Sequence, residues 1–343
     1  MNINLYGSTG VIGKLTLKLL SNYFPNYKIN LLCAKSNLKT LVNQCQIHQP
    51  NYVYLDNPNK INQLKSNLPK KTRILYKNDL LDYLENSKSD MSILAVSGYQ
   101  SLKYLEPILK NSKQMGIVSK EAIVSGGHIL KKLSKKYQCE IFPLDSEHYS
   151  IFSHFNKINL KQSNVKKINL TASGGPFYKK KFKSLTNVSF SQAIKHPKWK
   201  MGYKNSIDSA TLVNKCLELI EAHYLFDISY HNLDILIHPE SLVHSIIEYT
   251  NYTSNLIYFY NDMKIPIFNF LNNKENINFY EKKFTFPRNL NISLEIVDHE
   301  VYPVFKYFKS IDKTIPQNII KFNIGNQFAV DLFKEKKIKY VEI

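Results

Sequence analysis

The feature that most constrains the fold is a regular alternation of short apolar runs and amphipathic segments over residues 1–145. Amphipathic stretches such as VIGKLTLKLLSNYF and SLKYLEPILKNS lie between runs whose length is typical of strands. This alternation predicts an α/β fold with a Rossmann-like, doubly wound parallel sheet. The expected strands are INLY (3–6), KINLLC (28–33), YVYL (52–55), RILY (73–76), MSILAV (91–96), GIVS (116–119) and EIFPL (140–144).

The pattern changes after residue 145, which indicates further domains. Loop-forming stretches TASGGPF and KHPKWKMG precede one amphipathic helix over 209–226 and alternating runs near 233–259. A segment without clear hydrophobic periodicity (272–297) and a helical C-terminal segment follow. A chain of 343 residues is too long for one ordinary core. We therefore expect a Rossmann-like domain over 1–145, an α+β domain over 146–271, a linker over 272–297 and a helical domain over 298–343.

Hydropathy and cysteine spacing argue against several protein classes. No stretch approaches the roughly 20 apolar residues that a membrane span needs. The start, MNINLYGSTG, enters a strand at once, so we expect no signal peptide and a cytoplasmic location. The four cysteines form no CxxC pair, which argues against a disulfide framework and a zinc site.

The net charge of +19 needs a separate explanation. Only Arg73 and Arg288 among the 46 basic residues are arginines, whereas nucleic-acid readers generally use arginine for bidentate and stacking contacts. The lysines are spread along the chain, which favours compositional drift on solvated faces over a nucleic-acid surface. Attraction for anionic small molecules is expected to remain.

A glycine turn follows the first expected strand. Gly7, Gly10 and Gly13 give the spacing GxxGxxG, in which bare backbone N–H groups at a helix N-terminus can hold a diphosphate. Ser8 and Thr9 would add hydroxyl donors. Ordinary strand–helix turns also use glycine, but the position of this one in the first βα unit predicts a dinucleotide site.

The end of the second strand bears on the choice of cofactor. NAD enzymes usually carry an acid there for the ribose 2′-OH. This chain has Lys35, Ser36 and Asn37 instead, which suit a 2′-phosphate and favour NADPH. The alternative is that Lys35 is only one more surface lysine.

Acids and a hydroxyl cluster at the end of the last expected strand of the first domain. If the strand continued, Asp145 and Glu147 would point to one side and Ser146 to the other. Two adjacent carboxylates repel unless a proton or a cation lies between them, and oxygen ligands suit Mg²⁺ or Mn²⁺. The alternative is a helix start with Asp145 or Ser146 as N-cap.

A third acid lies on the helix expected over 209–226. Asn214, Lys215 and Glu218 share one flank by their spacing. They could be a surface ion pair with a polar neighbour, or part of a phosphate and metal site. Ser209 with Asn214 and Lys215 would form a phosphate grip, and Ser173 in ASGGPF offers a second anion cradle. Trp199, the only tryptophan, caps a site from a mobile loop or plugs a core edge.

Seven stretches form an ordered series along the chain: GSTGVIG, SKEAIVSGG, PLDSEHYSIF, TASGGPF, KHPKWKMG, SIDSATLVNKCLELIEA and IHPESLVHSIIEY. In order and spacing this series resembles the 1-deoxy-D-xylulose 5-phosphate reductoisomerase family, from residue 3 to about residue 335. The resemblance implies rearrangement of a linear ketose phosphate and reduction with NADPH to 2-C-methyl-D-erythritol 4-phosphate, an early step to isoprenoids. It also implies a homodimer. From the charge composition and hydropathy, neither nucleic acid nor a membrane is expected as a partner.

The resemblance further implies roles for individual residues. One divalent ion, Mg²⁺ or Mn²⁺, would be held by Asp145, Glu147 and Glu218, which with Lys120 form the catalytic set. The substrate would contact Glu147 and Glu218, and its carbon backbone would contact Ser146 and Lys120. Its phosphate would be bound by Ser173, His196, Ser209, Asn214 and Lys215, with His196 and Trp199 on a lid near 195–205. The expected NADPH contacts are Ser8, Thr9, Gly10, Val11, Ile12, Lys35, Ser119, Lys120, Glu121, Met201 and Gly202.

The chain also departs from the family pattern. Ser119 stands where the family usually has Asn, and Cys216 where it usually has Gly. The C-terminal helical domain is expected to be shorter than in relatives. Two alternatives stay open at this point: a decayed paralogue that binds NADPH or polyanions without turnover, and another NADPH-dependent dehydrogenase of an acidic substrate.

Overall fold

The computed structural model describes residues 1–158, 164–195, 202–272, 275, 277–281, 284 and 290–343. Contacts divide the chain into two compact units. Unit 1 contains Met1–Asp145 and Asp262–Glu281, and unit 2 contains Ser146–Asn261 and Lys282–Ile343. Asp145 is the last residue of the first stretch of unit 1. Residues 262–271 were expected in the second domain, whereas they group with unit 1.

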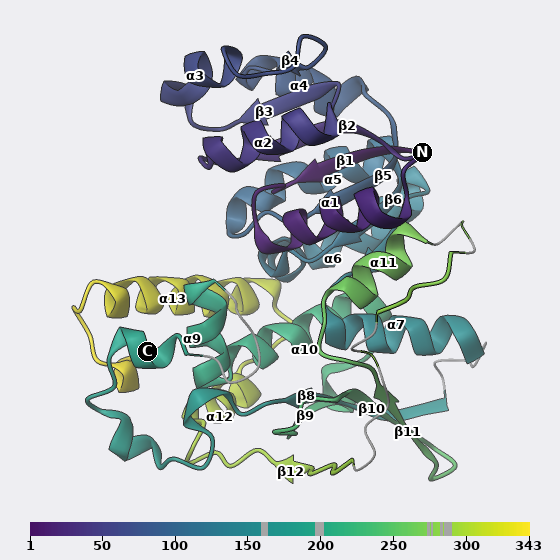
Figure 1. Cartoon of the computed structure of the whole chain (residues 1–343). Coiled ribbons are helices and arrows are strands. Elements are labelled where there is room, and N and C mark those ends of the chain that lie inside the picture. The colour runs from purple at the N-terminus through teal and green to yellow at the C-terminus, as the bar shows by residue number, and fades with distance from the viewer. Residues whose placement is uncertain (159–163, 196–201, 273–274, 276, 282–283, 285–289) are drawn as a thin grey trace. The chain divides into compact units, whose positions relative to one another are not determined.

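Unit 1 is built on a seven-stranded sheet in the order β4-β3-β2-β1-β5-β6-β7 (Figure 1). Every pair of neighbouring strands is parallel. The order reverses between β1 and β5, and in such sheets ligands bind beyond the carboxyl ends of the strands at that point. The strands are β1 (Asn2–Tyr6), β2 (Lys28–Ala34), β3 (Tyr52–Leu55), β4 (Arg73–Ile74), β5 (Ser89–Leu94), β6 (Ser112–Ile117) and β7 (Glu140–Pro143).

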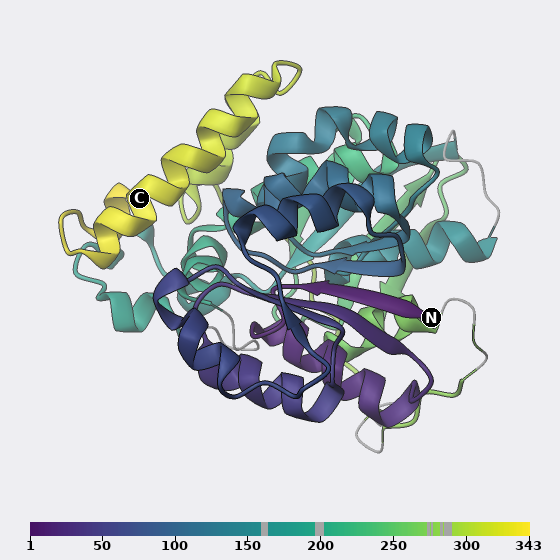
Figure 2. The same cartoon turned by 90° about the horizontal axis from the view of Figure 1, so that it is seen from above.

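Helices cover both faces of this sheet, as the alternating pattern predicts. The helices α1 and α2 lie on one face, and α4, α5 and α6 lie on the other (Figures 1 and 2). The helices are α1 (Val11–Tyr23), α2 (Leu38–His48), α3 (Ile61–Lys65), α4 (Lys77–Asn86), α5 (Leu102–Asn111), α6 (Lys120–Tyr137), α11 (Lys264–Leu271) and the 3₁₀ helices η1 (Pro58–Lys60) and η2 (Tyr99–Ser101).

Aromatic packing explains why α11 belongs to unit 1. The Phe270 ring lies 5.3 Å from the Phe142 ring on β7. The Tyr27 hydroxyl donates to the Leu271 carbonyl at 3.0 Å. A helix from late in the chain therefore completes the core of the first unit, which strand and helix periodicity alone did not indicate.

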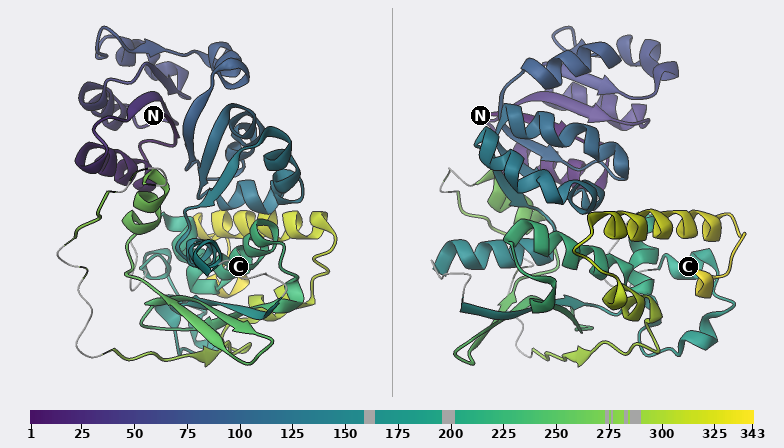
Figure 3. Two further views of the ribbon diagram at one scale, coloured as in Figure 1. Left: turned by 90° about the vertical axis from the view of Figure 1, so that its right-hand side faces the viewer. Right: turned by 180° about the vertical axis from the view of Figure 1, so that it is seen from behind.

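Unit 2 has a five-stranded sheet in the order β11-β10-β8-β9-β12. The pair β8·β9 is parallel and the other pairs are antiparallel. The helices α7 and α10 lie on one face of this sheet (Figures 1 and 3). The strands are β8 (Val165–Ala172), β9 (Leu233–Ile237), β10 (Val243–Tyr249), β11 (Ser254–Tyr258) and β12 (Glu295–Ile296).

The helices of unit 2 carry six of the predicted site residues: Ser146, Glu147, Ser209, Asn214, Lys215 and Glu218. Among the described residues, no helix of either unit combines the length and apolarity needed to cross a membrane. The helices are α7 (Ser146–Ile158), α8 (Phe190–Ala193), α9 (Tyr203–Thr211), α10 (Val213–Phe226), α12 (Pro303–Ser310), α13 (Pro316–Lys334) and the 3₁₀ helices η4 (Gly175–Phe177), η5 (Phe182–Leu185), η6 (Tyr230–Asn232) and η7 (Tyr340–Glu342).

The helix expected over 209–226 is two helices. Leu212 lies between α9 and α10 with φ of 70°, a left-handed conformation that ends one helix and begins the next. Left-handed backbone is unfavourable for a leucine by about 1–2 kcal/mol. Leu212 is only 1% exposed, so burial of its side chain offsets this strain. Ser209 consequently lies near the end of α9, and Asn214 lies in the first turn of α10.

The C-terminal segment was expected to be a separate helical domain, but it packs into unit 2. Val330 and Phe333 of α13 join an apolar cluster with Ile207 and Ala210 of α9 and with Phe177. Part of the expected linker is also ordered, because β12 pairs with β9. The apolar spacing of α13 indicated a helix correctly and gave no information on its packing partner.

The glycine turn after β1 is required by close packing. A Cβ on Gly7, whose φ is +90°, would lie 2.3 Å from the carbonyl oxygen of Ala95 at the end of β5. Gly7 and Ala95 lie where β1 and β5 end side by side, so only glycine fits at the point where the strand order reverses.

We predict that Gly7→Ala lowers the free energy of unfolding by at least about 3 kcal/mol, because it combines positive φ with a backbone clash. Gly325→Ala is the matched control: a Cβ there meets nothing within 4 Å, and alanine inside α13 raises the free energy of unfolding by up to about 1 kcal/mol. Urea denaturation followed by circular dichroism measures both. Equal midpoints for the two variants would contradict this account of the turn.

Candidate functional site

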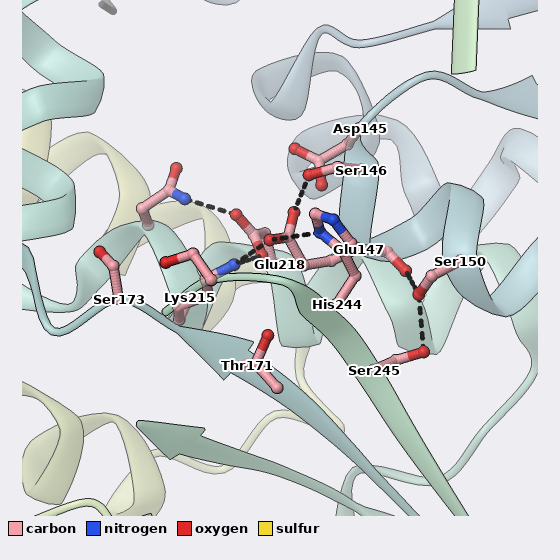
Figure 4. Close-up of polar contacts among 12 residues, drawn as sticks. Asp145, Ser146, Glu147, Ser150, Thr171, Ser173, Lys215, Glu218, His244 and Ser245 are labelled. Carbon is pink, nitrogen blue, oxygen red and sulfur yellow. Dashed lines mark hydrogen bonds and ion pairs between the residues drawn. The ribbon is translucent and has the colours of Figure 1, made fainter. Parts of the chain in front are cut away.

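Three carboxylates gather near the start of α7. Asp145 immediately precedes this helix, Glu147 lies in its first turn, and Glu218 lies on α10. One oxygen of each lies within 4.8 Å of an oxygen of the other two. Figure 4 shows the three side chains pointing toward a common region. Residues separated by some 70 positions in the sequence therefore form one acidic cluster.

The local reason for this arrangement is a helix start and not a continued strand. β7 ends at Pro143 and α7 begins at Ser146, so the expected alternation of side chains over 145–147 is wrong. Asp145 just before the helix and Glu147 in its first turn have carboxylate oxygens within 4.8 Å of each other. A carboxylate in the first turn is also favoured by the helix dipole. The helix start and the acidic cluster are therefore compatible, and they were not true alternatives.

Hydrogen-bond donors surround the oxygens of Glu147 and Glu218. Lys215 Nζ lies 2.8 Å from Glu147 Oε1 and 2.7 Å from Glu218 Oε2. The Ser146 hydroxyl donates to Glu147 Oε2 at 2.6 Å. The Asn214 amide donates to Glu218 Oε1. Dashed lines in Figure 4 trace these contacts.

Burial rules out the surface ion pair that the sequence left open for Lys215 and Glu218. The exposed fractions are 8% for Lys215 and 1% for Glu218. Removing one partner of such a buried pair typically costs about 3–5 kcal/mol, because the other charge is left without compensation. The flank of α10 that carries these residues faces the acidic cluster and not bulk water.

Lys120 supplies a second cation. Its Nζ lies 2.6 Å from Asp145 Oδ2, and both side chains are largely buried. Two ammonium groups, on Lys120 and Lys215, thus stand against three carboxylates. The remaining negative charge makes the cluster favourable for one further cation.

Two histidines and an acid adjoin the cluster, and the sequence analysis did not single them out. His244 Nδ1 lies 3.6 Å from Glu147 Oε1, and its ring stacks on Phe259 at 3.9 Å. His148 Nε2 lies 2.9 Å from the Glu218 carbonyl oxygen, which can only accept, so this nitrogen carries the proton. Glu221 Oε2 lies 3.9 Å from His148 Nδ1. SEHYS and LVHSII contained these histidines, but neither spacing nor periodicity separates them from core residues.

The donor set fits a divalent cation. Asp145, Glu147 and Glu218 offer only carboxylate oxygens, which suit Mg²⁺ or Mn²⁺. A second group in the same place, Asp145, His148 and Glu221, satisfies the same distance criterion. In that group His148 would offer Nδ1, because its protonated Nε2 donates to a backbone carbonyl. An imidazole nitrogen suits zinc, copper or iron better than Mg²⁺ or Mn²⁺. The all-oxygen group is the better match to a hard cation.

The loop TASGGPF lies against the end of α9. A Cβ on Gly175 would lie 2.9 Å from the Ser209 carbonyl oxygen, so the two segments touch. The Ser173 hydroxyl accepts from the Gly175 amide at 3.2 Å. Ser173 and Ser209, far apart in sequence, are thereby brought to neighbouring segments. Of the other expected phosphate and nicotinamide contacts, His196, Met201 and the lid residue Trp199 lie outside the described residues, while Gly202 is exposed at the N-cap of α9.

The expected dinucleotide turn has an open N-terminus on α1. Gly10 is the N-cap of α1, and Gly10 and Val11 are exposed, whereas Thr9 and Ile12 are half-buried. Ser8 is fully buried, and its hydroxyl has no hydrogen-bond partner among the described residues. The Ser8 side chain is therefore turned away from solvent, contrary to its expected role as a hydroxyl donor. Backbone N–H groups at the start of α1 remain suited to a diphosphate.

A second lysine that the sequence analysis missed, Lys60 of η1, contacts the segment after β2. Lys35 and Ser36 are exposed, and Lys60 Nζ donates to the Ser36 carbonyl at 3.0 Å. Asn37 caps α2, because its side chain accepts from the Thr40 amide at 3.2 Å. Two ammonium groups thus adjoin the place where a 2′-phosphate was expected. Lys60 is the last residue of the 3₁₀ helix η1, which periodicity does not reveal.

Ser119, the replacement for the usual Asn, points into the sheet. Its hydroxyl lies 2.7 Å from the Val96 carbonyl and 3.0 Å from the Leu94 carbonyl at the end of β5. It is 3% exposed and is the N-cap of α6, whose first turn holds Glu121, half-buried.

Cys216 is a core residue. It is fully buried on α10, and burial raises the pKa of its thiol far above the usual range. The thiol is therefore protonated and unreactive at neutral pH.

Three family models match the chain. The model described as "1-deoxy-D-xylulose 5-phosphate reductoisomerase" matches residues 3–127. The model described as "1-deoxy-D-xylulose 5-phosphate reductoisomerase C-terminal domain" matches residues 141–226. The model described as "DXP reductoisomerase C-terminal domain" matches residues 260–343. The three matched ranges follow one another along the chain and include residues of both units.

Relatives with the same name match over nearly their whole length. The 1-deoxy-D-xylulose 5-phosphate reductoisomerase of Pelagibacter ubique (strain HTCC1062) is 36% identical over 99% of this chain and 88% of its own. The enzyme of that name from Clostridium tetani (strain Massachusetts / E88) is 35% identical over 100% of this chain and 90% of its own.

Solved structures agree with these matches. A DOX-P reductoisomerase in complex with NADPH, fosmidomycin and magnesium is similar with a TM-score of 0.90 and 29% identity, covering 100% of this chain and 86% of that one. The 1-deoxy-D-xylulose 5-phosphate reductoisomerase from Zymomonas mobilis in complex with NADPH gives a TM-score of 0.88 and 28% identity, covering 99% of this chain and 88% of that one.

Proposed function

This chain belongs to the 1-deoxy-D-xylulose 5-phosphate reductoisomerase family, and from that premise we propose which of its residues carry the reaction. The activity is the NADPH- and divalent-metal-dependent conversion of 1-deoxy-D-xylulose 5-phosphate in isoprenoid precursor synthesis. The product is 2-C-methyl-D-erythritol 4-phosphate. The observation that carries the assignment of residues is the convergence of half-buried Asp145 and Glu147 with buried Glu218.

The metal ligands are Asp145, Glu147 and Glu218. Their oxygens are close enough to share one ion, and their excess negative charge over the neighbouring ammonium groups supports a cation there. When bound, the divalent ion supplies a Lewis acid for negative charge on the substrate's oxygens, and NADPH supplies a hydride. Ser146 holds one oxygen of Glu147 by a hydrogen bond, and His244 lies close to the other oxygen.

The substrate's phosphate and carbon chain are bound by residues around this cluster. Ser173, Ser209, Asn214 and Lys215 hold the phosphate, supported by the contact of the Ser173 loop with the end of α9. His196 completes the set on the basis of the family resemblance. Lys120 and Ser146 contact the carbon chain, where an ammonium group next to Asp145 can donate to a substrate oxygen.

NADPH is held at the start of α1. Backbone N–H groups around Thr9, Gly10, Val11 and Ile12 bind the diphosphate, and the backbone of Ser8 takes part while its side chain stays buried. Lys35 binds the 2′-phosphate, and Lys60 adds positive charge nearby. The other contacts are expected from the family resemblance at Ser119, Lys120, Glu121, Met201 and Gly202.

Several finer expectations remain part of this proposal. The ion is Mg²⁺ or Mn²⁺, and the enzyme is a cytoplasmic homodimer that binds neither nucleic acid nor membrane. The domain roles follow the units, with the cofactor in Met1–Asp145. The metal ligands are Asp145, the last residue of that stretch, Glu147 on α7 and Glu218 on α10.

We predict that NADPH is oxidised in the presence of 1-deoxy-D-xylulose 5-phosphate only when Mg²⁺ or Mn²⁺ is present. Absorbance at the nicotinamide band measures turnover, with NADH in parallel as a less efficient donor. Turnover that survives complete chelation would rule out the metal-dependent mechanism. Tight NADPH binding without turnover under any condition would favour a decayed paralogue.

We predict that Glu218→Gln lowers kcat at least about 100-fold, because loss of an outer-shell partner alone commonly costs 10–100-fold in metal enzymes. Glu248→Gln is the matched control. Glu248 also pairs with an amide, that of Asn169 at 2.6 Å, but lies outside the acidic cluster. Steady-state rates at saturating metal measure both variants. Comparable rates for the two would show that Glu218 is not a ligand.

A further inference from the structure

All four carboxylate oxygens of Glu147 and Glu218 already face donors of this chain. Lys215 contacts one oxygen of each acid, at 2.8 Å and 2.7 Å. Ser146 contacts the second oxygen of Glu147, and Asn214 the second oxygen of Glu218. A cation that takes two of these oxygens must therefore share them with these donors or replace some of the donors, because each oxygen has two lone pairs.

Lys215 is the contact most sensitive to such a cation. Its ammonium group bridges the two acids, and its side chain is 10% exposed. A divalent ion and an ammonium repel each other strongly where little water screens them. The hydroxyl of Ser146 and the amide of Asn214 are neutral and can remain beside a cation. Metal binding therefore weakens the hold of Glu147 and Glu218 on Lys215 in particular.

Lys215 is also one of the groups assigned above to the substrate's phosphate. Lysine has three rotatable donors on a flexible stem, so it can turn from a carboxylate to another anion nearby. Its position in the first turn of α10, next to Asn214, places it where backbone N–H groups also favour an anion. One ammonium group thus lies within reach of two competing sets of oxygens.

We propose that Lys215 couples metal binding to phosphate binding: it is the counter-ion of Glu147 and Glu218 until a divalent ion takes their oxygens, and it then binds the phosphate. This inference rests on the proposed function, because it uses the metal and phosphate assignments made there. By thermodynamic linkage, phosphate must then tighten metal binding by the same factor as the metal tightens phosphate binding.

The test measures Mn²⁺ binding by the electron paramagnetic resonance signal of free Mn²⁺, without NADPH or sugar substrate. The wild type is compared with Lys215→Met and with Lys167→Met, each with and without inorganic phosphate. Lys167→Met is the matched control, because it removes the same charge as Lys215→Met. Lys167 pairs with Asp234 at 3.0 Å on the sheet of unit 2. A protein-free titration corrects for Mn²⁺ bound by phosphate itself.

Lys215→Met is expected to tighten Mn²⁺ binding about 10-fold or more without phosphate, since hydrogen bonds to charged groups are typically of that order. Lys167→Met leaves the Kd at the wild-type value. Phosphate tightens Mn²⁺ binding to the wild type and to Lys167→Met, and has no effect on Lys215→Met. Lys215→Arg, which keeps the charge, retains the phosphate effect and serves as a second variant if Lys215→Met does not fold.

Two results would overturn the coupling alone. One is an equal change in Kd for Lys215→Met and Lys167→Met, which would indicate a general charge effect. The other is a wild-type Kd that phosphate leaves unchanged while Mn²⁺ still binds stoichiometrically. Absence of stoichiometric Mn²⁺ binding to every variant would overturn the metal assignment of the proposed function and the coupling with it.

Discussion

Three carboxylates within a few ångströms of one another repel unless cations lie among them, and this constraint governs the arrangement around α7 and α10. Lys120 and Lys215 neutralise part of the charge at contact distances of 2.6–2.8 Å. Burial of Glu218 makes the balance stricter, because an uncompensated charge there would be costly. Coordination by a divalent ion and pairing with lysines are therefore alternative solutions to the same electrostatic problem.

Backbone geometry prepares this cluster. The chain leaves β7 and enters α7 within a few residues, and the left-handed Leu212 separates Ser209 on α9 from Asn214 and Lys215 on α10. Packing of α13 against α9, through the cluster that contains Val330 and Phe333, supports the break between α9 and α10. The strained backbone at Leu212 and the packing around it thus orient a few polar side chains, as is common at functional sites.

Sequence patterns predicted a good part of this structure. Period and length sufficed for the parallel sheet and its helices, since strands buried on both faces read as continuous apolar runs. They failed at Leu212, where an amphipathic pattern continues across a break that only tertiary packing imposes. Lys215 and Glu218 could be grouped by spacing, but their burial, and the approach of His244 from β10, depend on contacts between distant segments. Lys60 was missed for the same reason.

The most direct test of the central claim is anomalous diffraction from a crystal of this protein soaked with Mn²⁺. The account predicts one strong anomalous peak per chain, with carboxylate oxygens of Asp145, Glu147 and Glu218 as its protein ligands. A peak held by Asp145, His148 and Glu221 instead, or no peak within coordination distance of Glu218, would contradict it.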